Sequence, residues 1–80
     1  MEEQDKINDI LQKMRPVLSR ELPTLLDKVG YEKHYGFYFT LKKDVLLDPI
    51  HLEGELDKAG IDIISIMGLS ERVYMVSIDY

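Results

Sequence analysis

The segment Tyr35-Gly36-Phe37-Tyr38-Phe39-Thr40-Leu41-Lys42 (residues 35–42) decides the fold class. Large apolar side chains recur at every second position, which predicts a β-strand with one face turned toward a core. The expected inward row is Phe37, Phe39 and Leu41, and the expected outward row is Gly36, Tyr38 and Thr40. The chain therefore contains a sheet, and the flanking segments decide what covers it.

The sequence after this strand predicts a helix and a β-hairpin. Lys42-Lys43-Asp44 turns the chain, and residues 45–47 fit either a short returning strand or a buried loop. Asp48 is a suitable N-cap and Pro49 suits the first helical position, so we expect a helix to about Ala59, ended by Gly60. Residues 61–67 and 72–78 are rich in strand formers and flank a Gly68-Leu69-Ser70-Glu71 turn, as in a hairpin.

The sequence before the strand predicts helix over residues 4–29. Its apolar residues recur at three- and four-residue steps: Ile7, Ile10, Leu11, Met14, Leu18, Leu22, Leu25 and Val29. Pro16 and Pro23 each remove a backbone donor, so a straight helix is not expected. The segment fits one kinked helix, or two to three short ones near 4–14 and 16–29, with Gly30 as the stop.

Together these elements predict a single α+β domain over residues 1–80. A kinked N-terminal helix (or two short helices) precedes a β-α-β-β order and a small, three- to four-stranded, mixed or antiparallel sheet. A crossover through the second helix makes the first two strands parallel. The final strand runs antiparallel to its hairpin partner, either beside it alone or inserted between the other two strands.

Composition excludes several classes of protein. No run approaches the roughly 20 apolar residues that span a bilayer, and the charged N-terminal residues differ from a secretory signal, so a cytoplasmic protein is expected. The chain has no cysteine and a net charge of −5. Residues 49–80 carry six acidic and two basic side chains, a balance of −4. Such a surface repels phosphate backbones, which disfavours direct nucleic-acid binding.

The sequence predicts no catalytic residue, no metal site and no cofactor. It has no phosphate-binding glycine loop, and no motif connects His34 or His51 with a serine. Asp48, His51 and Glu55 share one helix face and could in principle hold a divalent cation. A solvated face with Asp48 as the cap is the favoured interpretation, because a single helical histidine specifies little.

The faces of the sheet are the more informative feature. Both rows of the last two strands are largely apolar, whereas a sheet with one wet face should alternate between apolar and polar residues. If one helix covers each face, all of these residues are buried. If both helices cover the same face, an apolar patch remains for a second subunit or a partner protein: Tyr38, Ile63, Met67, Val73 and Met75.

The leading hypothesis is a non-catalytic protein-interaction module, such as a small regulator, accessory subunit or inhibitor. It would act through the apolar sheet face and the acidic surface. The alternative is a dimeric regulatory domain that binds a small ligand or metabolite, as paired α+β sensor domains do between subunits. Gly60 and Gly68 bracket a strand and could let such a ligand approach the backbone.

Overall fold

The computed structural model describes residues 2–79, and it has an α+β fold with two helices and an open four-stranded antiparallel sheet. The elements in chain order are α1 (Glu2–Glu21), β1 (Leu26–Glu32), β2 (Gly36–Leu41), α2 (Pro49–Lys58), β3 (Ile63–Gly68) and β4 (Val73–Ile78). The predicted fold class is therefore confirmed. The predicted strand at residues 35–42, the second helix and the C-terminal hairpin all form.

The N-terminal helix is one element, and it is shorter than predicted. α1 runs through Pro16 and ends at Glu21, immediately before Leu22 and Pro23. Pro16 lies on the exposed side of the helix, away from the sheet. The predicted stripe is buried up to this end, at Ile7, Ile10, Leu11, Met14 and Leu18, and Val17, which was not predicted, is buried with them.

Residues 26–32 form a strand, so the prediction of helix to residue 29 is wrong. β1 pairs with β2, and the pairing shifts between Leu26 and Lys28 because one extra residue, Asp27, is inserted there. Such a β-bulge places two residues opposite one on the neighbouring strand. Leu26 and Val29 consequently both pack against the core although they are three residues apart. In the sequence this spacing resembles a helix period.

The sheet has the strand order β1-β2-β4-β3, and all neighbouring pairs are antiparallel. β4 lies between β2 and β3, which is the inserted arrangement considered above. Because both β2 and β3 run antiparallel to β4, they run in the same direction and are connected by α2. β1 and β3 are the two edge strands.

The loop between β2 and α2 is tied to the central strand by Tyr74. The Tyr74 hydroxyl donates to the carbonyl oxygen of Val45 at 3.0 Å and accepts from the backbone N–H of Leu47 at 3.3 Å. Residues 45–47 are a loop rather than a returning strand. Asp48 Oδ1 then accepts from the N–H of Ile50 at 3.0 Å and begins α2, as predicted for an N-cap.

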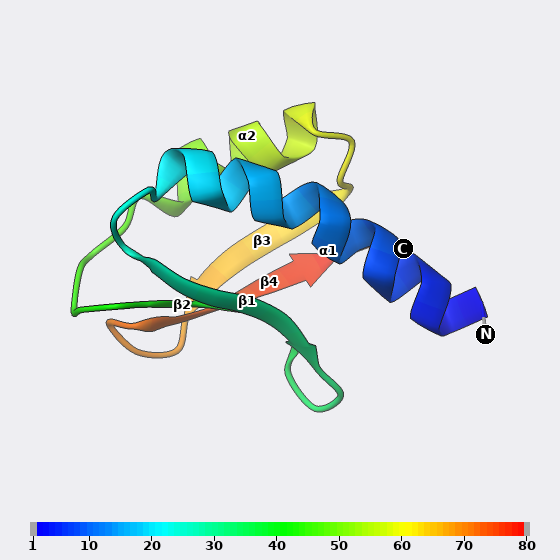
Figure 1. The fold of residues 1–80 in the computed structure, drawn as a ribbon, viewed down its shortest axis with the longest axis horizontal. Coiled ribbons are helices and arrows are strands. Elements are labelled where there is room, and N and C mark those ends of the chain that lie inside the picture. Colours follow the sequence, from blue (N-terminus) through cyan, green and yellow to red (C-terminus); the bar gives the residue numbers. More distant parts are fainter. Residues whose placement is uncertain (1, 80) are drawn as a thin grey trace.

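Both helices lie on the same face of the sheet (Figure 1). α1 packs against β1, α2 packs against β3, and the two helices contact each other. The core between helices and sheet contains the inward residues of β2 and β4 together with the helix stripes: Ile7, Ile10, Leu11, Met14, Val17, Leu18, Leu22, Phe37, Phe39, Leu41, Leu52, Leu56, Ile61, Ile66, Tyr74 and Val76. Among the described residues, no helix covers the opposite face.

Candidate functional site: the uncovered face of the sheet

The face of the sheet that points away from both helices is the candidate site, and we call it the open face. Its members alternate along each strand with residues that pack against the core, and they are aligned across strands by the observed pairing. They are Lys28, Gly30 and Glu32 on β1, Gly36, Tyr38 and Thr40 on β2, Val73, Met75 and Ser77 on β4, and Ser65 and Met67 on β3.

A row of four residues crosses the middle of the open face. Gly30 pairs with Tyr38, Tyr38 with Met75, and Met75 with Met67. The Tyr38 ring lies over Gly30, since a Cβ added to this glycine would be 2.9 Å from the Tyr38 hydroxyl oxygen. The glycine thus lets the tyrosine lie along the sheet instead of standing up from it. The centre of the open face is consequently apolar, and its side chains rise little above the plane of the sheet.

Four of the five residues predicted for an interaction patch lie on this face: Tyr38, Met67, Val73 and Met75. Tyr38, Val73 and Met75 are half-buried, and Met67 is 55% exposed. The structure thus brings these four together on one surface. Their role as a contact surface stays a prediction.

The fifth predicted residue, Ile63, does not join them. Ile63 pairs with Ile78 and packs against the core, because a bulge shifts the pairing between Ile63 and Ser65. The residue inserted by the bulge, Ile64, is 64% exposed instead. The strand pattern alone gave no signal for this exchange, since a bulge changes the inside-outside alternation without changing the residue types.

A groove runs over the β1 side of the open face, with a volume of about 470 Å³. The β1–β2 turn bends away from the helices at one end of the sheet (Figure 1). Tyr35 of this turn and Glu32 at the end of β1 line the groove. Leu69 from the β3–β4 turn, together with Lys28 and Val73, lines the remainder. Tyr35 and Leu69 were not predicted. An apolar residue within the Gly68-Leu69-Ser70-Glu71 turn is the signal that could have identified Leu69.

The open face carries two opposite charges on its edge strand. Lys28 and Glu32 both line the groove, and neither forms an ion pair with another residue in the range 2–79. Their Cα atoms are about 13 Å apart, four residues along the strand, and no salt bridge joins Lys28 to Glu32. The nearby Asp27 accepts a hydrogen bond from Thr40 Oγ1 at 3.4 Å and does not line the groove.

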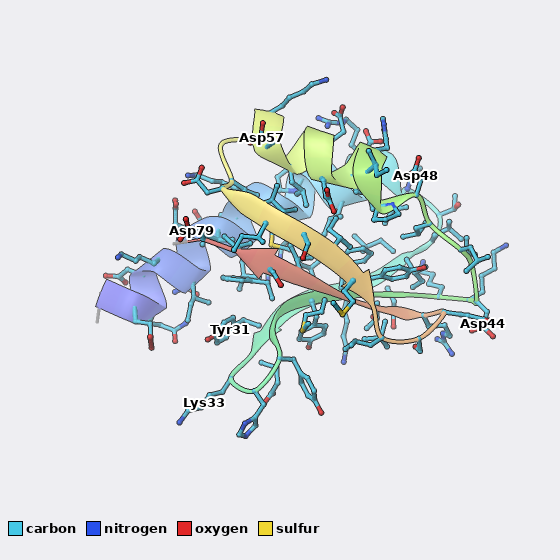
Figure 2. The ribbon with its side chains drawn as sticks, turned by 180° about the vertical axis from the view of Figure 1, so that it is seen from behind. Tyr31, Lys33, Asp44, Asp48, Asp57 and Asp79 are labelled. Carbon is cyan, nitrogen blue, oxygen red and sulfur yellow. The ribbon has the colours of Figure 1, made fainter. Side chains whose placement is uncertain are left out.

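The residues considered for a metal are engaged with other partners on the helix side, where Figure 2 labels Asp48 at the start of α2. Asp48 caps α2, and His51 Nε2 lies 2.7 Å from Glu21 Oε1. Glu55 accepts hydrogen bonds from Arg20 at 2.9 Å and Lys58 at 3.2 Å. Within residues 2–79, no three His, Cys, Asp or Glu side chains are grouped as a metal site requires.

These contacts join the end of α1 to α2. Two hydrogen bonds lower the pKa of the Glu21 carboxyl below its usual value; the larger effect comes from His51 and the smaller from Arg20. Glu53, on the neighbouring turn of α2, accepts the backbone N–H of Ile66 through Oε2 at 3.1 Å. It thereby covers a donor on the β3 edge. Two acids of the second half of the chain, Glu53 and Glu55, are therefore engaged in contacts within the fold.

Comparisons with known proteins add no family assignment. The chain matches no protein-family model, no curated protein and no solved structure. In the part of the chain that the structure describes, no helix is both long and apolar enough to span a bilayer. What the structure defines is thus an α+β fold with an open antiparallel sheet, whose two helices share one face.

Proposed function

We propose that the protein is a non-catalytic interaction module whose open face contacts another protein. The carrying observation is that α1 and α2 cover the same face, which leaves Tyr38, Met67, Val73 and Met75 without a covering element. Proteins that remain monomeric seldom leave a contiguous apolar patch exposed. Tyrosine and methionine are enriched at interfaces, and methionine adapts its shape to a partner.

The charge of the chain supports a protein partner over a nucleic acid. The net charge is −5, and the open face contributes one positive and one negative side chain to it. An acidic chain with a nearly neutral apolar face repels phosphate backbones and favours apolar contacts. In this role the protein would act as a small regulator, accessory subunit or inhibitor, which we expect to work in the cytoplasm.

Substitution of the open face tests this proposal. We expect a partner captured from the native host by the wild-type protein to be lost with Met75→Glu, because a carboxylate in the middle row would be buried at the interface. Ile50→Glu is the matched control, since Ile50 is 76% exposed on α2, on the helix side. Circular dichroism checks that both variants fold. Partners that bind Met75→Glu as well as the wild type would contradict the proposal.

The groove favours a second candidate function, the binding of a small ligand. Its volume of about 470 Å³ falls in the range of ligand pockets, roughly 300–1,000 Å³. Tyr35, Tyr38 and Leu69 would supply apolar contacts, and Lys28 and Glu32 would contact polar groups. Thermal-shift measurements with amino acids, nucleotides and divalent cations test it. A ligand that stabilises the wild type but not Tyr38→Ala supports this function, and no stabilisation by any of them contradicts it.

A further inference from the structure

The pattern of residues on the open face is complementary to itself under a twofold rotation. The middle row consists of Gly30, Tyr38, Met75 and Met67. On one side of it, Lys28, Thr40 and Val73 form a second row by their observed pairing. On the other side, Glu32 pairs with Gly36, and Ser65 pairs with Ser77.

We propose that the open face binds a second copy of this chain, with the twofold axis lying along the middle row. This inference rests on the proposed function, because it names the partner of the same surface. After rotation about this axis, the middle row of one copy faces the middle row of the other. Each outer row faces the opposite outer row of the other copy. The contact is isologous, so each residue pair occurs twice.

The charges select this axis. The rotation places Lys28 of one copy over Glu32 of the other, and the reverse, so two ion pairs form between side chains that have no ion-pair partner within residues 2–79. An axis parallel to the strands would instead place β1 over β3. Lys28 and Glu32 would then face the β3 row that contains Ser65 and Met67, and both charges would be desolvated without a counter-charge.

The side-chain sizes agree with the same axis. The row with Thr40 and Val73 is tall, whereas the row with Gly36, Ser65 and Ser77 is low. The rotation seats each tall row on the low row of the other copy. Methionine side chains from both copies meet along the axis, where their flexibility lets them fill the space between the two sheets.

The twist of the sheet also permits close contact. A twisted sheet is saddle-shaped, and the turn between β1 and β2 bends away from the helices at one corner (Figure 1). With a twofold axis across the strands, a corner of one sheet that bends toward the partner lies over a corner of the partner's sheet that bends away. The two surfaces are then parallel, as in aligned sheet packing about 10 Å apart.

The size of the face sets the expected strength. Four strands of about six residues cover roughly 400 Å² in projection, given the usual strand spacing and rise. A standard stable interface buries about 800 Å² per partner. We therefore expect a reversible dimer with a dissociation constant in the micromolar range or weaker. Sedimentation velocity from on the order of 10 μM to 1 mM covers this range.

A charge-exchange experiment tests the arrangement. In Lys28→Glu, both copies present carboxylates to each other, and in Glu32→Lys both present ammonium groups. Each single variant should dimerise roughly tenfold more weakly than the wild type, given the usual strength of exposed ion pairs. An equimolar mixture should recover the wild-type association, because both ion pairs re-form in the heterodimer. The double variant Lys28→Glu/Glu32→Lys should recover it as well.

The recovery distinguishes a specific contact from general repulsion or from misfolding. The heterodimer carries the same total charge as the wild-type dimer, and a misfolded variant would not recover on mixing. Lys43→Glu and Asp57→Lys make the same charge changes at exposed positions away from the open face and should leave dimerisation unchanged. A wild type that stays monomeric at the highest concentration overturns the dimer, as does a mixture that associates no better than its components.

These outcomes can be separated from failure of the proposed function. The wild type could be monomeric and yet capture a partner that the Met75→Glu variant does not bind. In that case the open face is a contact surface, but its occupant is not a second copy of this chain. If the wild type dimerises, Met75→Glu abolishes this and the charge exchange gives no recovery, the twofold arrangement is wrong. If Met75→Glu affects neither association nor capture, the open face is not a contact surface and both proposals fail.

Discussion

The hydroxyl oxygen of Tyr38 lies 2.9 Å from the position that a Cβ at Gly30 would occupy. The two residues are paired on neighbouring strands, and the tyrosine ring covers the glycine on the open face. The backbone of Gly30 does not require glycine, since only Gly36 and Gly60 have positive φ angles in the described chain. Glycine is needed at position 30 only for the space it leaves to the ring.

A double-mutant cycle measures this relationship. In a Tyr38→Ala background, Gly30→Ala should stabilise the protein by about 0.5–1 kcal/mol, because alanine loses less backbone entropy than glycine on folding. In the wild-type background the gain should be smaller or reversed, since the ring must move. Urea denaturation at a low protein concentration gives the four free energies of unfolding. Additive effects would show that the ring does not rest on Gly30.

Tyr74→Phe should loosen the loop before α2, which keeps the backbone hydrogen bond from the Val45 N–H to the Glu71 carbonyl oxygen at 3.3 Å. The variant loses the hydrogen bonds with Val45 and Leu47 but keeps the stacking on Phe39, whose ring centroid is 5.3 Å away. We expect a loss of about 1–2 kcal/mol in the free energy of unfolding. Hydrogen exchange should become faster at the Leu47 amide and stay unchanged in the middle of β4.

Tyr31→Phe is the control for this substitution. Tyr31 contacts Phe37 edge to face with a centroid distance of 5.0 Å, and its hydroxyl has no hydrogen bond to another residue in the described range. The change should alter the free energy of unfolding by less than about 0.5 kcal/mol. Equal losses in both variants would contradict a specific role of the Tyr74 hydroxyl.

Glu53→Ala should uncover the edge of β3. The Ile66 N–H then loses the carboxylate acceptor that Glu53 provides at 3.1 Å, and we expect a cost of about 1–2 kcal/mol. An unpaired edge strand also recruits other strands, so aggregation on heating should increase. Glu53→Gln keeps an acceptor oxygen and should be much less harmful. Alanine and glutamine variants with the same stability and solubility would argue against this role.

Acid should weaken the contact between α1 and α2. Because the contacts with His51 and Arg20 lower the pKa of Glu21 in the folded state, Glu21 binds a proton more readily in the unfolded chain. Its stabilising contribution is therefore present above the ordinary glutamate pKa of about 4.3 and is lost as the pH falls through the lower, folded-state value. The stability difference between the wild type and Glu21→Gln should accordingly shrink toward zero in strong acid.

The pH dependence of Glu71→Gln provides the comparison for Glu21→Gln. Glu71 is exposed, and its side chain forms no ion pair within residues 2–79. Denaturation midpoints measured between neutral pH and about pH 2 should differ between wild type and Glu71→Gln by the same small amount throughout. A constant difference for Glu21→Gln as well would show that its carboxylate is not stabilised by the helix contact.

Local sequence signals predicted the elements whose own residues follow a simple period or have clear start and stop residues. The alternation in residues 35–42 identified β2, and Asp48, Pro49 and Gly60 identified both ends of α2. Strand formers on either side of a glycine-containing turn identified β3 and β4. Each of these signals depends only on residues close in sequence, which is why it could be recognised without a structure.

The remainder depended on features that a one-dimensional pattern does not record. The bulge at Asp27 gave β1 the three-residue step of a helix, and the bulge at Ile64 turned Ile63 toward the core. The contacts of Glu21 with His51 and of Arg20 with Glu55 depend on how α1 crosses α2. Periodicity also shows that a helix has an apolar stripe, but not which face of the sheet that stripe covers.

The sequence predicted most of the apolar residues of the candidate surface but not how far that surface extends. Apolar residues in both rows of the last strands indicated a face in need of cover, and Tyr38, Met67, Val73 and Met75 do share it. Tyr35 and Leu69 lie in the β1–β2 and β3–β4 turns, outside the strands, and both line the groove on this face. The strand alternation gives no rule for residues in turns, so it could not assign these two to a face.

The position of β4 between β2 and β3 has a consequence for biosynthesis. As the polypeptide leaves the ribosome, β1 and β2 can pair early, but β3 has no neighbour until residues 73–78 emerge. Until then the helices can pack only on the β1–β2 pair, and the core side chains of β2 stay partly exposed to solvent. Folding should therefore complete after synthesis of β4, and a nascent chain stalled before residue 73 should remain sensitive to protease.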